Sequence, residues 1–334
     1  MKICIVGPGI MPIPPTGWGA VEILIHDMRC SLENLGHEVH IVNVKDKSEM
    51  IRQANELSAD FVHVQYDEHI DIVPHLTCKN VAITSHYGYL EQPQRWDTGY
   101  RNIVQKFLQT DVDVFALSPG ISNLYKTLAS TNQGITHPSF TDSRVHVVHN
   151  GVRDDLFVCE DTPEYPDRTI YLAKVDFRKR QHMFQSIPSL YFAGNNVCDK
   201  FDVSSPRYLG EWSKEHLYKN LTKYANLALL SDGEAHPLVC MEAMSAGLGL
   251  VISEYSCGNL DMSKPFIDVI PESLIQDVGY VERIIKENAQ KSIAMRKQIR
   301  EYAETFSWDN VIESVFLPAV DAVMKKDKVD HDED

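Results

Sequence analysis

The residues best suited to chemistry include two glutamates, Glu234 and Glu242, on either side of a predicted helix start at Pro237. Proline suits the first position of a helix, because the N–H it lacks would be unpaired there anyway. A carboxylate in such a place can accept hydrogen bonds from two vicinal hydroxyls, as on a ribose or a hexose. The backbone N–H groups of Leu238 and Val239 would face a phosphate in the first turn. An ordinary helix with acidic residues near its positive end is the alternative interpretation.

A second candidate is the basic run at residues 174–180, which follows a predicted strand at residues 169–173. Lys174, Arg178 and Lys179 place positive charge at the end of a strand in a chain that is acidic as a whole. A pyrophosphate would be stabilised there, because its oxygens accept charge-assisted hydrogen bonds. A solvated helix start is the alternative interpretation of the same charges.

A third candidate is the glycine- and proline-rich segment between a predicted strand at residues 2–7 and a predicted helix at residues 20–35. Gly17, Trp18 and Gly19 end this segment, and the two glycines let the backbone approach a ligand closely. The helix start that follows offers N–H groups to a phosphate. The segment matches neither the GxGxxG nor the GxxxxGK[ST] pattern, and a tight turn without a ligand is the alternative.

Strand and helix patterns alternate along the whole chain, which predicts α/β architecture with doubly wound parallel sheets. A polar, proline-containing linker at residues 150–167 divides the alternation into two halves. Strands are predicted at residues 2–7, 38–44, 61–66, 80–85, 114–118, 145–149, 169–173, 189–193, 227–231, 249–253 and 266–270. Helices are predicted at residues 20–35, 48–57, 100–108, 120–129, 179–186, 214–221, 237–246, 275–286, 289–304 and 308–324.

Taken together, these segments resemble glycosyltransferase family 4 over nearly the whole chain. Glu234-x7-Glu242, followed by Ala-Met-x-Ala-Gly247, is similar to the family's EX7E motif and its EAMAxG continuation. Further similarities cover Gly17-Trp-Gly19-Ala-Val-Glu22 (GG-x-E), Thr84-Ser-His86 (T-x-H), His149-Asn150-Gly151-Val152 with Phe157 (the interdomain NGV segment), Leu172-Ala-Lys174-x4-Lys179 (G-R-x4-K-G), Leu209-Gly210 (F-L-G) and Phe306-Ser-Trp308 (F-S-W).

The resemblance implies roles for individual residues. Lys174 and Lys179 would neutralise the diphosphate of a nucleotide sugar as it leaves, Glu234 would hold hydroxyls of the donor sugar, and His86 would lie near the donor sugar or the acceptor. These four are the predicted catalytic residues. The residues predicted to bind the donor are Gly17, Trp18, Gly19, Asn150, His236, Pro237, Leu238, Val239 and Glu242, with Glu242 on the ribose hydroxyls.

Several positions depart from the family pattern. Lys174 replaces the usual arginine and so loses the bidentate fork while keeping the charge. Ala173 replaces a glycine, and Pro237 removes one backbone N–H that could have bonded a ligand. The second half is also short between residues 186 and 211, which predicts a trimmed β–α unit.

The fold implied by the resemblance is GT-B, two Rossmann-like doubly wound domains facing a cleft. The expected divisions are an acceptor domain at residues 1–157 and a nucleotide-sugar donor domain at residues 158–305. A C-terminal helix at residues 306–324 would cross back to the first domain, and a charged tail would occupy residues 325–334.

The implied activity is that of a retaining glycosyltransferase of the hexosyltransferase type, moving a sugar from a UDP- or GDP-sugar to a saccharide, glycan or other hydroxyl acceptor. A GT-B sugar-nucleotide epimerase and a non-catalytic sugar-nucleotide-binding protein are the alternatives. No cofactor beyond the donor substrate is expected. No metal site is expected either, since the interior DxD, Asp111-Val-Asp113, is interpreted as a solvated strand start.

Charge and composition narrow the partners and the compartment. Lys and Arg number 32 and Asp and Glu 47, a net charge of −15, which disfavours nucleic-acid binding and leaves at most peripheral membrane contact. An odd number of cysteines, 7, none in CxxC spacing, favours a reducing compartment. The chain enters its first strand without a signal-peptide pattern, so a cytoplasmic location is expected.

Overall fold

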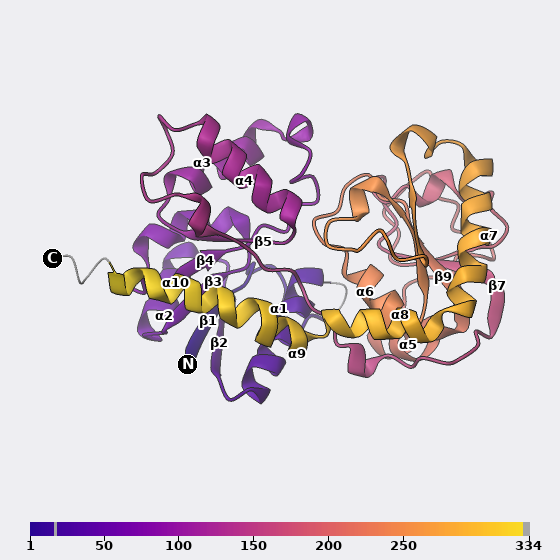
Figure 1. The fold of residues 1–334 in the computed structure, drawn as a ribbon, viewed down its shortest axis with the longest axis horizontal. Coiled ribbons are helices and arrows are strands. Elements are labelled where there is room, and N and C mark those ends of the chain that lie inside the picture. Colours follow the sequence, from indigo (N-terminus) through magenta and orange to yellow (C-terminus); the bar gives the residue numbers. More distant parts are fainter. Residues whose placement is uncertain (17–18, 330–334) are drawn as a thin grey trace. The chain divides into compact units, whose positions relative to one another are not determined.

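The computed structural model describes residues 1–16 and 19–329, and the chain divides into two compact units (Figure 1). Unit 1 contains Met1–Gly151 and Trp308–Asp334, and unit 2 is the continuous segment Val152–Ser307. Each unit has its own parallel sheet and its own apolar core. The predicted α/β architecture with two doubly wound sheets is therefore confirmed.

The sheet of unit 1 has the order β2-β1-β3-β4-β5-β6, with every pairing parallel. Strands β3, β4 and β5 are buried along their whole length, as expected when both faces of a sheet are covered. The chain order reverses between β1 and β3, so the loops that leave these two strands diverge at the carboxyl edge. The strands are β1 (Lys2–Val6), β2 (Glu38–Val42), β3 (Phe61–Val64), β4 (Val81–Ile83), β5 (Asp113–Ala116) and β6 (Val145–Val147).

The helices of unit 1 start where the sequence supplies a cap. The side chains of Asp46, Asp97 and Ser118 each accept a backbone N–H at the start of a helix, which satisfies a donor that has no partner inside the helix. A 3₁₀ helix at Asp67–His75, which the sequence patterns did not predict, joins β3 to β4. The α-helices before residue 151 are α1 (Ala20–Asn34), α2 (Lys47–Glu56), α3 (Thr98–Gln109) and α4 (Pro119–Thr131).

The C-terminal segment belongs to unit 1. The predicted helix at residues 308–324 is present as α9 (Trp308–Val311), a π-helical turn (Ile312–Phe316) and α10 (Leu317–Val329). Phe316 packs against the rings of Phe61 and Phe115 from the sheet, at centroid distances of 6.1 and 5.9 Å. The side chain of Ser31 on α1 donates a hydrogen bond to Asp309 at 2.9 Å. These contacts tie the end of the chain to the core of unit 1.

The aspartate pair at the entry of β5 corrects an expectation. Asp113 is fully buried rather than solvated, and it lies in unit 1 against Arg144 at 2.9 Å, His146 at 2.7 Å and Lys326 of α10 at 2.6 Å. Burial alone would raise the pKa of Asp113, but hydrogen bonds from His146 and Lys326 and the nearby positive charges outweigh it and lower the pKa. The DxD sequence is therefore a structural ion-pair centre at the amino end of the strand.

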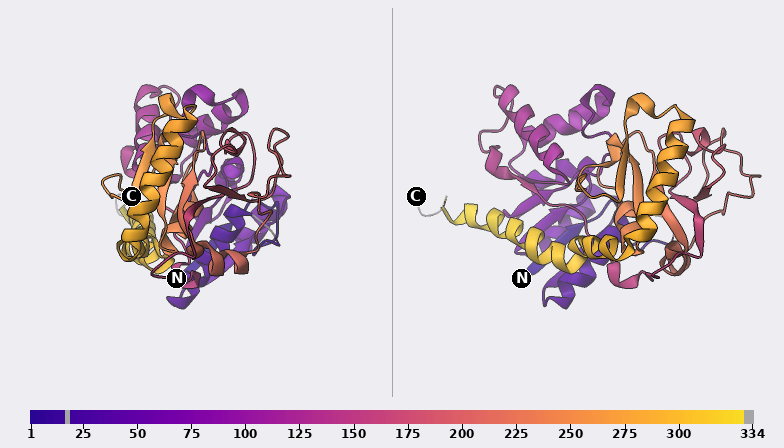
Figure 2. Two further views of the ribbon diagram at one scale, coloured as in Figure 1. Left: turned by 90° about the vertical axis from the view of Figure 1, so that its right-hand side faces the viewer. Right: turned by 45° about the vertical axis from the view of Figure 1, so that its right-hand side comes forward.

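The sheet of unit 2 has the order β11-β10-β9-β7-β8, again with parallel pairings. Helix α7 packs across β7, β9, β10 and β11 and lies alongside the sheet in Figure 2. The strands are β7 (Tyr165–Leu172), β8 (Leu190–Ala193), β9 (Tyr224–Leu229), β10 (Gly249–Ser253) and β11 (Ile267–Ile270). The helices are α5 (Lys214–Asn220), α6 (Leu238–Ser245), α7 (Val278–Ala294) and α8 (Arg296–Ala303).

The chain order in unit 2 reverses between β7 and β9, since β8 lies on one side of β7 and β9 with its successors on the other. The loops that leave β7 and β9 therefore diverge at the carboxyl edge of the sheet. Open α/β sheets bind their ligands at such switch points. The basic run at residues 174–180 and the loop that carries Glu234 are these two loops.

Two predictions about unit 2 are wrong in detail. The helix predicted at residues 179–186 is absent, and a short 3₁₀ helix, Gln181–Met183, stands in its place. Arg180 has a left-handed backbone with φ of 59°, which a right-handed helix starting at Lys179 cannot contain. Strand β7 begins at Tyr165, inside the predicted linker at residues 150–167. Between β8 and α5 the described residues form loops with isolated bridges only.

Candidate active site

The loop that leaves β7 carries the two predicted catalytic lysines. Lys174 is exposed directly after the strand. Farther along, the side chain of Asp176 accepts the backbone N–H of Lys179 at 2.8 Å, which closes a tight turn. Tyr171, buried inside β7, donates its hydroxyl to the carbonyl of Lys179 and accepts the N–H of Leu230 at 2.8 Å. The two loops at the switch point are thus joined through one tyrosine.

Lys179 forms an ion pair with Glu234, the first glutamate of the EX7E-like motif. Arg178 also approaches Glu234 at 3.4 Å and donates to the carbonyl of Gly233 at 2.6 Å. Burial alone would raise the pKa of Glu234, but Lys179 and Arg178 outweigh it and lower the pKa. Glu234 is therefore an ionised carboxylate at neutral pH, and it can accept hydrogen bonds from hydroxyl groups.

Arg180, the last residue of the basic run, pairs with acidic residues other than Glu234. Its guanidinium forms two hydrogen bonds with Glu272, one of them at 2.9 Å, and lies 4.0 Å from Asp232. A left-handed backbone costs a non-glycine residue free energy, so a bidentate partner at this position offsets strain in the loop. The pairing holds residue 180, and with it the neighbouring Lys179, against the β11 side of the sheet.

Helix α6 follows the Glu234 loop and is buried along most of its length, because its residues are apolar on nearly every side. The structure places Pro237 at the cap rather than at the first helical position, and α6 begins at Leu238. Leu238 and Val239 are half-buried in its first turn, while His236 is buried just before it. The positive end of α6 thus lies at the carboxyl edge, next to the Glu234 loop.

Glu242 lies within α6 and is buried to 8 % exposure. Its carboxylate accepts a hydrogen bond from Lys214, at the start of α5, at 2.7 Å. The two glutamates of the motif are thus each paired with a lysine, Glu234 with Lys179 and Glu242 with Lys214. No sequence signal identified Lys214, because it lies far from Glu242 along the chain and outside every motif.

Of the predicted loop in unit 1, Gly17 and Trp18 lie outside the described residues, and Gly19 caps α1 with its backbone. A β-carbon at Gly19 would lie 2.6 Å from a carboxylate oxygen of Glu22, so a larger residue there would require the buried Glu22 side chain to shift. Earlier in the loop, Asn43 accepts the N–H of Gly9 and donates to the carbonyl of Met11, both at 2.7 Å. These contacts fix the loop that leaves β1.

Asn150 and His86, the other predicted residues of unit 1, follow β6 and β4. Asn150 is buried, and its carbonyl accepts Nδ1–H of His149 at 3.1 Å. His86 is half-buried, and its Nε2 lies 2.8 Å from the side-chain oxygen of Gln65. Loss of water lowers the pKa of His86 to about 4, so the imidazole is neutral at pH 7. Gln65 was not predicted.

The predicted site residues that the structure describes are divided between the two units. Unit 1 holds Gly19, His86 and Asn150, and unit 2 holds Lys174, Lys179, Glu234, His236, Pro237, Leu238, Val239 and Glu242.

Within the described part of the chain, no three His, Cys, Asp or Glu side chains gather as a metal site would require. In residues 1–16 and 19–329, no helix combines the length and the apolar composition needed to span a bilayer.

Comparison with solved structures relates this architecture to known folds. HepE (Alr3699) of Anabaena, solved with UDP and glucose, has a TM-score of 0.67 over 93 % of this chain and 97 % of its own, at 14 % identity. Sucrose-phosphate synthase of Thermosynechococcus elongatus gives 0.67 over 93 % and 96 %, at 13 % identity. The chain has the GT-B fold.

A third similar structure is AviGT4, a glycosyltransferase involved in avilamycin A biosynthesis, with a TM-score of 0.68 over 98 % of both chains at 15 % identity. No family model and no curated protein sequence matches the chain. At these identities the similarity establishes the GT-B fold, and the chemistry must be argued from this chain's own residues.

Proposed function

We propose that this protein is a retaining glycosyltransferase of family 4, of the hexosyltransferase type. It would move a sugar from a nucleotide-diphosphate sugar to a hydroxyl of a saccharide or other acceptor. The observation that carries the proposal is the pairing of Lys179 with Glu234 at the switch point of the unit 2 sheet, beside the positive end of α6. HepE, which shares the fold, was solved with UDP and glucose and with UDP-glucose, ligands of the proposed class.

The diphosphate of the donor is assigned to Lys174, Lys179 and the first turn of α6. Lys174 is exposed at the strand end, and Lys179 has three N–H donors, so it can keep Glu234 and still bind a phosphate oxygen. The N–H groups of Leu238 and Val239 add the partial positive charge of a helix start. Charge that builds on the leaving diphosphate would be stabilised by groups already in place, and such stabilisation is the main source of rate enhancement in many enzymes.

The hydroxyl groups of the donor are assigned to the two glutamates. Glu242 would bind the ribose, with Lys214 holding its carboxylate in one orientation at 2.7 Å. Glu234 would bind hydroxyls of the transferred sugar, since its ionised carboxylate keeps free lone pairs beyond those used by Lys179. From unit 1, we assign His86 to the donor sugar or the acceptor. The segment at Gly17–Gly19 is assigned to the β-phosphate, and Asn150 to the donor.

Nucleotide binding and turnover test the proposal directly. The full chain is titrated calorimetrically with UDP and with GDP, then incubated with UDP- and GDP-sugars while the released nucleoside diphosphate and the fate of the sugar are followed. A transferase releases the diphosphate with a sugar of retained anomeric configuration. An epimerised nucleotide sugar would indicate the epimerase, and tight binding without turnover across a range of saccharide acceptors would favour a non-catalytic binding protein.

Metal chelation should leave the activity unchanged. In the proposed site, cationic side chains and a helix start would balance the diphosphate charge without a divalent ion. We therefore expect equal turnover with excess EDTA and with added Mg²⁺ or Mn²⁺, measured as released nucleoside diphosphate. A loss of turnover in EDTA that Mn²⁺ or Mg²⁺ specifically restores would contradict this assignment.

A further inference from the structure

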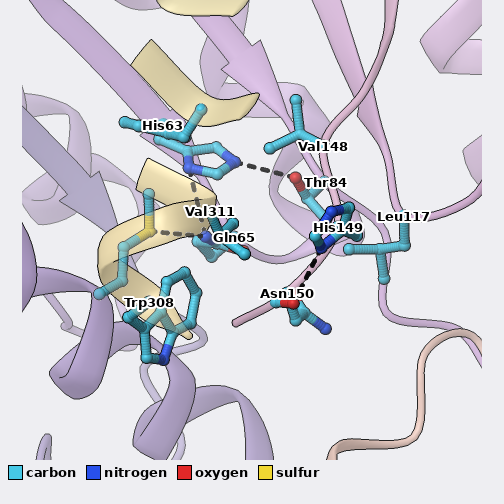
Figure 3. Close-up of a pocket in the computed structure, with 11 residues that line it drawn as sticks. His63, Gln65, Thr84, Leu117, Val148, His149, Asn150, Trp308 and Val311 are labelled. Atoms are coloured by element: carbon cyan, nitrogen blue, oxygen red, sulfur yellow. Dashed lines mark hydrogen bonds between the residues drawn. The ribbon is translucent and has the colours of Figure 1, made fainter. Parts of the chain in front are cut away.

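A chain of hydrogen bonds runs through the interior of unit 1 behind His86. Nε2 of His86 lies 2.8 Å from the oxygen of Gln65, the Gln65 nitrogen lies 3.2 Å from Nδ1 of His63, and Nε2 of His63 lies 2.8 Å from the hydroxyl of Thr84. Gln65, His63 and Thr84 are buried to 2–3 % exposure. Figure 3 shows the last two links between β3 and β4.

The chain has two possible directions, and a neighbouring methionine selects one. In one direction, each group donates to the next along the path from His86 to Thr84. In the opposite direction, the amide of Gln65 is flipped and each imidazole carries its proton on its other nitrogen. The Gln65 nitrogen also lies 3.7 Å from the sulfur of Met28, which is buried in α1. A thioether accepts a hydrogen bond but cannot donate one, so the nitrogen rather than the oxygen of Gln65 faces Met28.

With the amide so oriented, the protons of both imidazoles are fixed. The oxygen of Gln65 can only accept, so His86 must donate from Nε2. The nitrogen of Gln65 donates to Nδ1 of His63, so His63 carries its proton on Nε2 and donates to Thr84. A neutral imidazole has one N–H, and Nδ1 of His86 is therefore left as a hydrogen-bond acceptor.

We propose that Gln65 and His63 are positioning residues that hold His86 in the Nε2–H form, so that its Nδ1 accepts a hydrogen bond from a sugar hydroxyl. The inference rests on the proposed function and specifies the chemistry of His86 within it. The ligand class is a hydroxyl of the donor sugar or of the acceptor. Because an acceptor nitrogen is needed, the imidazole works in its neutral form, in agreement with the low pKa values of His86, about 4, and His63, about 3.

The sequence places these groups where the topology requires them. Gln65 leaves β3 at the switch point of the unit 1 sheet, and Thr84 and His86 leave the adjacent β4. Alternate residues of an extended segment point to the same face, so His63 and Gln65 lie side by side, as do Thr84 and His86. A His-x-Gln beside a Thr-x-His on neighbouring strands therefore produces this chain of hydrogen bonds.

The first test reads the protons directly. Long-range ¹⁵N–¹H spectra of the full chain with ¹⁵N-histidine, assigned with His63→Asn and His86→Asn, should show both residues as neutral Nε2–H tautomers at pH 7. UDP-glucose is then added alone, followed by a saccharide acceptor. The ¹⁵N resonance of His86 Nδ1 should shift on addition of the ligand that supplies the hydroxyl. An Nδ1–H tautomer of His86 in the ligand-free protein overturns the inference, whether or not the protein transfers sugar.

The second test uses Gln65→Met, which keeps the volume and removes both links. We expect kcat to fall about 10–10²-fold with a smaller change in KM, because the imidazole loses its orientation. The matched control is Gln105→Met on the exposed face of α3, which should leave kcat unchanged. A Gln65→Met protein that melts like the wild type and keeps both its kcat and its His86 spectrum would contradict the positioning role.

The third test uses Gln65→Glu, which keeps an acceptor for His86 but adds a negative charge. The charge raises the pKa of His86, so the imidazolium form, which has no acceptor nitrogen, gains population. Turnover should be low at pH 6 and recover as the pH rises above the new pKa, while the wild type stays flat over that range. A flat Gln65→Glu profile counts against the inference. Failure of the wild type to bind any nucleotide sugar, with the expected tautomers present, would contradict the proposed function alone.

Discussion

Replacing Lys179 with alanine should lower turnover about 10²-fold or more, since it removes one preorganised charge at the leaving diphosphate. In unit 2, Lys179 is also the direct partner of Glu234, so the substitution loosens a second proposed binding group. Both the affinity for UDP or GDP, measured by calorimetry, and the release of nucleoside diphosphate from the donor should fall. Lys179→Arg should recover part of the loss, because it keeps the charge but not the compact ammonium.

Lys297→Ala is the matched control for this experiment. Lys297 lies in the same unit on α8, with 87 % of its side chain exposed, and its ion pair with Glu301 is long at 4.0 Å. An exposed pair of this kind contributes little, so turnover and nucleotide affinity should stay at wild-type values. A Lys179→Ala protein that is folded and as active as Lys297→Ala would remove Lys179 from the proposed donor site.

Replacing Asp113 with asparagine should destabilise unit 1 by about 3–5 kcal/mol, because it removes the buried negative charge that two half-buried cations share. Arg144 and Lys326 both pair with this carboxylate, which has no exposed side-chain surface. Hydrogen exchange followed by mass spectrometry separates the units. Protection should fall in the β5 and β6 segments and in the α10 segment, while the strands of unit 2 keep theirs.

The neighbouring Asp111 supplies the control, since its side chain is 56 % exposed and forms an ion pair with Arg144 at 2.8 Å. Asp111→Asn should cost about 0–1 kcal/mol. The pH dependence has a definite sign as well. The pKa of Asp113 is lowered in the folded state, so its contribution is complete above the unfolded value of about 3.9 and is lost as the pH falls through the folded value. The difference between wild type and Asp113→Asn should therefore shrink below about pH 4.

Strand positions were predictable because the signal is local. Runs such as those of β3 and β9 are mostly apolar, and both faces of each strand are buried. The strand ends moved by a few residues, since pairing with neighbours rather than local composition decides where a strand stops. The helix predicted at residues 179–186 is absent for a different reason: Arg180 has a left-handed backbone, and its side chain pairs with Glu272, which lies far away in the sequence.

The candidate site was predictable in its motifs and not in its partners. Glu234 and Glu242 stand out through their spacing, and Lys179 stands out through its place after a strand. Other contacts join segments that are far apart in the sequence, and the local pattern does not show them. Examples are those of Lys214, of Gln65 and of the buried Asp113 cluster. The sequence cannot show whether a charged residue next to a strand is exposed to solvent or paired with a buried counter-charge. Only the folded structure distinguishes these two environments.

The two places where the chain passes between the units have a consequence for protein engineering. In unit 1, a β-carbon on Gly151 would lie 2.6 Å from the ring of Trp308, so the two cut ends of that unit touch. In unit 2, the N–H of Val152 donates to the carbonyl of Phe306 at 2.8 Å, so its own ends are neighbours too. Unit 2 is thus a continuous insertion in the sequence of unit 1, and its two ends lie next to each other. A short glycine-rich splice from residue 151 to residue 308 would close unit 1, and another insert could be carried at the same junction.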